Sequence, residues 1–182
     1  MKKCLLMCLL LASCTKRTTN TEEFSNSHVG MSRKESVMKV VNRIEINAAP
    51  EKVFYWLEEP ERAKKWVTNV SRSEFIKKTP NKVGTTFREY IEEEGQGIEM
   101  QGVVTEFQPN KAYAVHLESE SHSADVRFVL TENVDSTQLI QSVELHFKNE
   151  LSDDVLNSIK KSIMSQAQSE FARLKELCEQ DD

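Results

Sequence analysis

The chain has 182 residues, of which 38% are hydrophobic and 29% are charged, and its formal net charge is -5. These values are typical of a soluble globular domain, and the length suits one domain with a short appendage. The basic residues are scattered among carboxylates and form no basic stripe, so the composition argues against a nucleic-acid partner.

The four cysteines do not indicate a disulfide framework. Cys4, Cys8 and Cys14 lie close to the start of the chain, and Cys178 lies alone near its other end. The sequence contains no CxxC pair and no Cys/His cluster with the spacing of metal ligands. We therefore expect no metal site and no cofactor.

Residues 1–13 have the features of a signal peptide. Lys2 and Lys3 give a positive start, residues 4–11 form an apolar core too short to span a bilayer, and small residues follow. The tetrad Leu11-Ala12-Ser13-Cys14 resembles the lipobox of bacterial lipoproteins. That resemblance implies cleavage before Cys14 and attachment of acyl chains such as palmitate to it. The alternative is a chance apolar start that contains a cysteine.

Residues 14–36 are predicted to be the lipidated cysteine and a flexible polar tether. The segment is rich in Thr, Ser and Asn, and it cannot bury enough apolar surface to fold alone. Two or more acyl chains on Cys14 would hold the protein stably at a membrane. Because Thr15 and not Asp follows the cysteine, the resemblance favours the bacterial outer membrane, with the protein facing the periplasm.

Residues 37–180 are predicted to form one folded domain. An alternating apolar pattern from Val37 to Ile46 predicts a first strand, and short helices are predicted from Pro50 onward and over Glu61 to Trp66. Turn residues then separate six further strands, which are expected to form an antiparallel meander. They are Ser71 to Lys78, Thr85 to Glu93, Ile98 to Phe107, Ala112 to Ser119, Ala124 to Thr131 and Gln138 to Phe147.

The segment from Ser152 to Gln180 predicts a long amphipathic helix. Ser152 can cap its start, two aspartates complement the helix dipole in the first turn, and neither Gly nor Pro follows. Met164 widens the apolar stripe, whereas Glu170 falls among the charged residues of the other side. The strands must cover the apolar stripe, so we expect an α+β fold with a curved seven-stranded antiparallel sheet around this helix.

This order of elements resembles the START-like superfamily, also called SRPBCC, whose bacterial members include the polyketide cyclase/dehydrase and lipid transport family. The resemblance rests on residues 47–54 (NAAPEKVF), Trp66, residues 83–85 (VGT) and residues 105–111 (TEFQPNK). It covers essentially all of the predicted domain. It implies a helix-grip fold, in which the sheet curls around the terminal helix and leaves a cavity for an apolar ligand.

The period-two pattern of the strands predicts which side chains face this helix. We expect a subset of aromatic and Met residues to line the cavity: Trp66, Phe87, Met100, Tyr113, Phe128, Met164 and Phe171. Such side chains suit an adaptable pocket, but they suit a filled core equally well. Two inward polar residues, Glu89 and Gln141, complete the candidate ligand-binding set. A buried carboxylate there needs a partner or a proton, unless a bulge turns Glu89 outward.

No catalytic residue is predicted. His116 and His146 fall on the outward phase of their strands and His122 falls in a turn, so we expect all three to be solvated. Cys178 has no neighbouring His to lower its pKa and is expected to be a core residue. The sequence contains no nucleophile elbow and no phosphate-binding loop.

The sequence thus predicts a membrane-anchored lipoprotein that binds an apolar small molecule or lipid in the cavity. One alternative is an enzyme of the polyketide cyclase/dehydrase kind, which would need a buried polar pair near Glu89 or Gln141. The other is a protein-interaction module with a filled core and an exposed apolar patch. Fold resemblance alone does not choose among these functions, because one fold hosts many.

Overall fold

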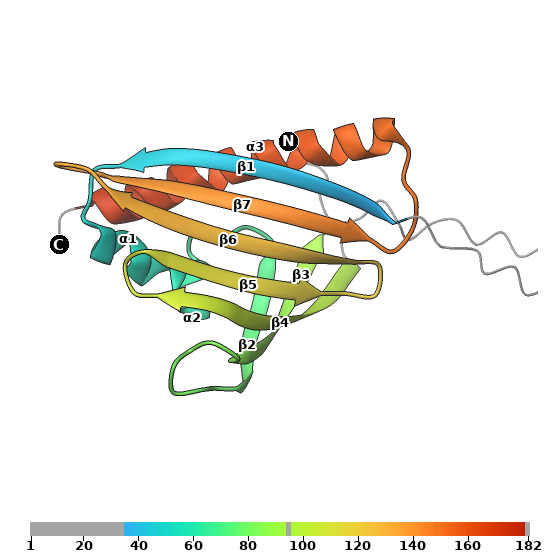
Figure 1. Cartoon of the computed structure of the whole chain (residues 1–182), viewed down its shortest axis with the longest axis horizontal. Helices are drawn as coiled ribbons and strands as arrows, with labels where there is room; N and C mark the ends of the chain where they lie inside the picture. Colours follow the sequence, from blue (N-terminus) through green and yellow to red (C-terminus); the bar gives the residue numbers. More distant parts are fainter. Residues whose placement is uncertain (1–34, 94–95, 181–182) are drawn as a thin grey trace, which may run out of the picture.

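The computed structural model describes residues 35–93 and 96–180. The predicted signal peptide, Cys14 and nearly all of the predicted tether lie outside these residues. The described chain forms one antiparallel sheet and three helices, as the sequence predicts (Figure 1). The elements are β1 (Ser36–Ile46), α1 (Pro50–Leu57), α2 (Pro60–Ala63), β2 (Val70–Lys77), β3 (Thr86–Glu93), β4 (Gln96–Gln108), β5 (Ala112–Glu118), β6 (His122–Glu132), β7 (Thr137–Phe147) and α3 (Asp153–Glu179).

The seven strands form a single sheet in the order β1-β7-β6-β5-β4-β3-β2. Strands β2 to β7 each pair with their neighbours in sequence, as expected for a meander. β1 instead pairs with β7, so that Ser36 lies opposite Phe147 and Ile46 lies opposite Thr137. The Ser36 hydroxyl also accepts a hydrogen bond from the Leu151 N–H at 2.9 Å, which ties the start of β1 to the loop before α3.

The helices begin where the sequence predicts. The Ser152 hydroxyl accepts a hydrogen bond from the Val155 N–H at the start of α3, and acidic residues occupy the first turn. Pro50 and Pro60 begin α1 and α2, since the fixed φ of proline suits a first helical turn. α2 is shorter than predicted: the helix ends at Ala63, and residues 64–66 form hydrogen-bonded turns.

The two halves of α3 pack differently. The C-terminal half buries Ala167, Glu170, Phe171, Leu174 and Cys178, and no other residue of the helix is fully buried. Leu174 and Cys178 pack in a core cluster with residues of α1 and with the neighbouring ends of β1, β6 and β7. Figure 1 shows α3 running along β1 and β7, with α1 beside its C-terminal half. The helix is therefore firmly held at one end and only partly buried at the other.

None of the described helices combines the length and the hydropathy that crossing a membrane requires.

Gly102 of β4 makes room for an aromatic side chain of the inner face. It lies opposite Phe87 of β3, and a Cβ atom built on Gly102 would overlap the Phe87 ring. Phe87 is buried, so its ring has little freedom to move aside. Glycine is thus required at this position because the ring lies across the β4 backbone.

We expect Gly102→Ala to lower the free energy of unfolding by about 1–3 kcal/mol, since the added methyl group forces the Phe87 ring out of its position. Urea denaturation measures the change. Gly97→Ala is the matched control on the same strand, because a Cβ there meets no atom within 4 Å. Equal stability of the two variants would contradict the proposed role of Gly102.

Candidate functional site

A cavity of about 240 Å³ lies between the inner face of the sheet and the N-terminal half of α3. Its sheet side is mostly apolar, with Ser121, His122 and Gln141 as the polar exceptions. The side chains there come from β3 to β7 and include Ile91, Met100, Leu117, Ala124, Val126, Val143, Leu145 and Phe147. The cavity exists because the N-terminal half of α3 does not pack as closely on the sheet as the C-terminal half does.

The helix side of this cavity is polar as well as apolar. Ser158, Ser162, Gln166 and Glu170 line it at every fourth position of α3, beside the apolar Ile159, Ile163 and Ala167. Residues four apart on a helix lie on the same face, so these four polar side chains form a row along the cavity. We call them the polar row of α3. A ligand here meets mainly apolar side chains on the sheet and a row of hydrogen-bonding groups on the helix.

A second, smaller compartment of about 180 Å³ adjoins the first. It lies against α1, α2 and the inner face of β2, β3, β5 and β6, and it reaches β7 and α3. Four residues line both spaces, namely Leu117, Val126, Gln141 and Glu170. We therefore treat the two spaces as the larger and smaller compartments of one site, with these four residues at their junction.

Seven of the nine predicted ligand-binding residues line this site. Trp66, Phe87, Glu89, Tyr113 and Phe128 line the smaller compartment, Met100 lines the larger one, and Gln141 lines both. The inward phase that the period-two pattern predicts for these strands thus agrees with their placement.

Met164 and Phe171 do not line either compartment. Met164 is 39% exposed, because it lies one position beyond Ile163 and so falls at the solvent edge of the helix. Phe171 is buried in the core cluster that holds the C-terminal half of α3. The prediction that they line the cavity is wrong for opposite reasons: Met164 lies at the solvent-exposed edge of the helix, and Phe171 lies within the packed core.

Glu89 is the most perturbed carboxyl group of the site. It lies in the wall of the smaller compartment, opposite Ser73 of β2 and beside Tyr113 and Lys64. Burial raises the pKa of Glu89 to about 7, although Lys64 and the Ser73 hydroxyl act to lower it. Burial also raises the pKa of Tyr113, and the charge of Glu89 adds to this effect. Glu89 is therefore inward, as predicted, and can hold or release a proton near neutral pH.

Gln141 has its partner within the sheet. Its Oε1 atom accepts a hydrogen bond from the Asn42 Nδ2 at 2.9 Å, and the two residues are opposite each other on β7 and β1. The same register places Asn42 on the inner face. Gln141 thus has a hydrogen-bond partner in Asn42, a second inward polar residue that the sequence analysis did not identify.

Glu170 is a site residue that the sequence analysis placed on the wrong side of the helix. It is buried, and its Oε1 accepts hydrogen bonds from the Thr68 N–H at 2.8 Å, the Thr68 hydroxyl at 2.5 Å and the Gln166 side chain at 2.9 Å. These bonds tie α3 to the loop between α2 and β2. The sequence did contain a signal for this placement, namely the four-residue spacing of Glu170 from the other members of the polar row. It was missed because a charged residue on a helix is usually assigned to the exposed face.

His122 is buried and not solvated, which corrects the prediction from its place in a turn. The turn between β5 and β6 is shorter than predicted, because the Ser119 N–H already bonds to the His122 carbonyl at 2.9 Å. His122 is therefore the first residue of β6 and lines the end of the larger compartment. Its Nδ1 lies 3.2 Å from the Ser119 hydroxyl and 3.0 Å from the Ser121 hydroxyl. Desolvation lowers the pKa of His122, so the ring is neutral at pH 7.

The Ser119–His122 contact does not form a catalytic pair. The Ser119 hydroxyl also lies 2.8 Å from the His122 carbonyl and accepts from the His122 N–H at 3.2 Å. These bonds commit Ser119 to the turn, and the residue is buried. Its role is to close the hairpin, because a nucleophile must be accessible to substrate.

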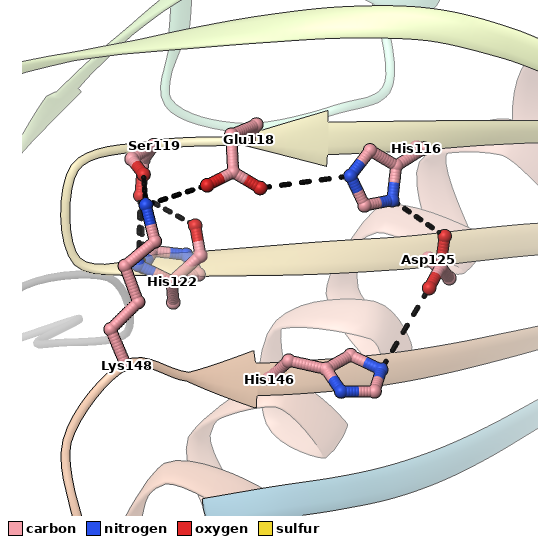
Figure 2. Close-up of polar contacts among 7 residues, drawn as sticks. All are labelled: His116, Glu118, Ser119, His122, Asp125, His146 and Lys148. Atoms are coloured by element: carbon pink, nitrogen blue, oxygen red, sulfur yellow. Dashed lines mark hydrogen bonds and ion pairs between the residues drawn. The ribbon is translucent and has the colours of Figure 1, made fainter. Parts of the chain in front are cut away.

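The polar contacts of this turn continue across β5, β6 and β7 through Lys148, whose Nζ donates to the Ser119 carbonyl at 2.8 Å (Figure 2). Asp125 lies between two histidines, with Oδ1 2.7 Å from the His116 Nδ1 and Oδ2 3.8 Å from the His146 Nε2. Lys148 pairs with Glu118 at 2.6 Å. His116 and His146 are each 36% exposed, so the prediction that they face outward is confirmed. This part of the network therefore lies on the outer face and does not contribute to the cavity.

The described residues contain no group of side chains that could hold a metal ion. Cys178 is a buried core residue, and burial raises the pKa of its thiol to about 12, so it is not a thiolate nucleophile at neutral pH. What the site offers is an apolar space with a few hydrogen-bonding groups, of which Glu89 can exchange a proton.

Comparison with solved structures identifies the same fold in several proteins. A START superfamily protein from Mycobacterium smegmatis matches with a TM-score of 0.65 and 15% identity, over 76% of this chain and 98% of that chain. Ara h 8.0201 matches with a TM-score of 0.60 and 16% identity, over 78% and 97% of the two chains. The di-domain ARO/CYC StfQ from the steffimycin biosynthetic pathway gives 0.67 and 11%, over 79% of this chain and 51% of that chain.

These identities are low, so the structural matches show the fold alone. No curated protein matches the chain in sequence. The family model described as polyketide cyclase / dehydrase and lipid transport, however, matches residues 37–179, which is nearly all of the described domain. The chain therefore belongs to the polyketide cyclase / dehydrase and lipid transport family and has the START-like helix-grip fold.

Proposed function

We propose that this protein binds an apolar small molecule or lipid non-covalently in the two-compartment cavity. The observation that carries the proposal is the open space of about 240 Å³ between α3 and the apolar inner face of the sheet. A ligand there removes apolar surface from water, which contributes roughly 25 cal/mol per Å². Concave, mostly apolar sites with a few polar groups are the usual form of small-molecule binding sites.

We also propose that the domain is held at a membrane through acylated Cys14. The proposal rests on the resemblance of residues 11–14 to a lipobox and on the polar segment that separates them from the fold. Such an anchor would keep the domain in the bacterial cell envelope, at the outer membrane on its periplasmic side. Apolar molecules concentrate in membranes, so this location would keep a binding protein for them close to its ligand.

An enzyme that uses the same cavity is the second candidate function. The specific observation in its favour is Glu89, whose carboxyl group has a pKa of about 7 within the site and can transfer a proton at neutral pH. The interaction module is less favoured, because it requires a filled core and the site is open.

Ser162→Phe tests the proposed cavity, because the new ring fits a space that is larger than the roughly 150 Å³ that suffices for benzene. We expect this variant to bind the protein's apolar ligand at least about tenfold more weakly. Native mass spectrometry and organic extraction of protein from its own host would first identify the ligand. Ser165→Phe makes the same change at an exposed position of α3 outside the lining and should bind normally. Equal ligand affinity of Ser162→Phe and Ser165→Phe would contradict the proposal.

The anchor predicts that the wild-type chain incorporates labelled palmitate in a bacterial host and fractionates with membranes. Cys14→Ser should abolish both, because the acyl chain has no other attachment point in the lipobox. Cys8→Ser keeps the tetrad and serves as the control. If Cys14→Ser were still labelled, or the wild type were not, the anchor would be excluded.

The raised pKa of Glu89 should make the stability of the protein depend on pH. Because its pKa is raised from 4.5 to about 7 in the folded chain, folding retains a proton that the unfolded chain has lost. The free energy of unfolding should therefore fall as pH rises between these two values. The stability of Glu89→Gln relative to the wild type should increase by about 1–3 kcal/mol between pH 5 and pH 8. Urea denaturation at both pH values measures this.

The control for the loss of a carboxylate is Glu120→Gln, in the exposed turn between β5 and β6. Its stability should follow the pH profile of the wild type. Parallel profiles for Glu89→Gln and the wild type would show that Glu89 is not a buried proton carrier.

A further inference from the structure

One oxygen of Glu170 accepts no hydrogen bond from the residues that the structure describes. The three hydrogen bonds that this carboxylate makes all fall on Oε1, from two groups of Thr68 and from Gln166. No described residue donates to Oε2. Glu170 is only 7% exposed, and it lines both compartments. One oxygen therefore fastens the loop between α2 and β2, and the other is available to a molecule in the cavity.

The charge of this carboxylate is not balanced within the site. Neither Glu170 nor Glu89 forms an ion pair with a described side chain. Lys64 is the one basic residue in the described lining, and its Nζ pairs with the Glu61 Oε1 at 2.8 Å. His122, at the far end of the larger compartment, is neutral at pH 7 because burial lowers its pKa. Glu170 at the junction of the compartments is thus in no ion pair with a described side chain, while the charge of Lys64 acts on Glu89 in the smaller compartment.

A cation supplied by the ligand would remove this imbalance. A buried carboxylate without a positive partner is costly, and a charge-assisted N–H···O bond is among the strongest polar contacts in proteins. A carboxylate or phosphate group at this point would instead be repelled by Glu170. A neutral hydroxyl could donate a hydrogen bond to Oε2 but would leave the charge uncompensated.

We propose that the ligand is an amphipathic amine, with its apolar body in the larger compartment and its protonated amino group on Oε2 of Glu170. This proposal rests on the proposed ligand-binding function and gives its chemical class. The polar row of α3 leads directly to this point, since Ser158, Ser162 and Gln166 precede Glu170 at four-residue steps. The amine would displace solvent from the junction without disturbing the bonds of Oε1.

The test compares three probes with the same ten-carbon chain: decylamine, decanol and decanoate. The full chain with Cys14→Ser is used, so that no acyl chain at that position competes for the cavity. Displacement of an environment-sensitive apolar dye gives the affinity of each probe. We expect decylamine to bind about tenfold or more tightly than decanol, and decanoate to bind most weakly.

Glu170→Gln should bring the affinity of decylamine to within about twofold of that of decanol, because the amide still accepts from Thr68 but carries no charge. Glu176→Gln is the matched control, since it removes one exposed carboxylate from the same helix outside the cavity. It should keep the preference for the amine. The preference surviving in Glu170→Gln, or disappearing in Glu176→Gln, would overturn the assignment.

A measurement on the wild-type cavity covers the case in which Glu170→Gln does not fold. The carboxyl ¹³C resonance of Glu170 should shift further on addition of decylamine than on addition of decanol, and equal shifts would contradict the assignment. Binding of decanol or decanoate as tightly as decylamine would exclude the amine ligand while leaving the proposed function intact. If none of the three probes bound, the proposed function itself would fail with it.

Discussion

The packing of the C-terminal half of α3 against one end of the sheet is the constraint on which the rest of the structure depends. Leu174, Cys178, Ile46 and Leu139 are almost wholly excluded from solvent in this cluster. Interiors packed to this density resist displacement, so they fix where the helix lies. Since α3 runs as one unbroken helix from Asp153 to Glu179, its other half must pass over the sheet at a set distance. The cavity is the space that this distance leaves.

The chemistry of the site follows from two periodicities that meet across this space. The strands alternate with period two and turn apolar side chains inward, whereas the helix turns a polar row toward the same cavity at every fourth residue. An apolar space alone would select ligands by size and hydrophobicity. The combination with Glu89, Gln141 and Glu170 adds hydrogen-bonding groups at fixed positions, which give orientation and selectivity.

Much of this could be predicted from the sequence, because the strongest signals were local and repeated. The alternation of the strands gave the inner face, and Ser152 with the stripe that follows gave the helix and its start. The errors arose at residues whose burial is determined by tertiary contacts and not by the local pattern. Met164 and Phe171 fit the stripe equally well, and only packing against the sheet separates an exposed residue from a core residue. Glu170 looked like a surface charge until Thr68, distant in sequence, supplied its donors. The burial of His122 could not be predicted because it depends on the length of the hairpin between β5 and β6. A hydrogen bond from the Ser119 N–H makes that hairpin shorter than its sequence suggests.

The pairing of β1 with β7 also determines where the described fold begins relative to the cavity. Ser36 lies opposite Phe147, which lines the larger compartment, and it is bonded to the loop that leads into the loosely packed half of α3. The first described strand therefore begins beside the half of α3 that is only partly buried. Whatever the domain is joined to through the chain before Ser36 is thus joined at the cavity end of the sheet and not at the closely packed end.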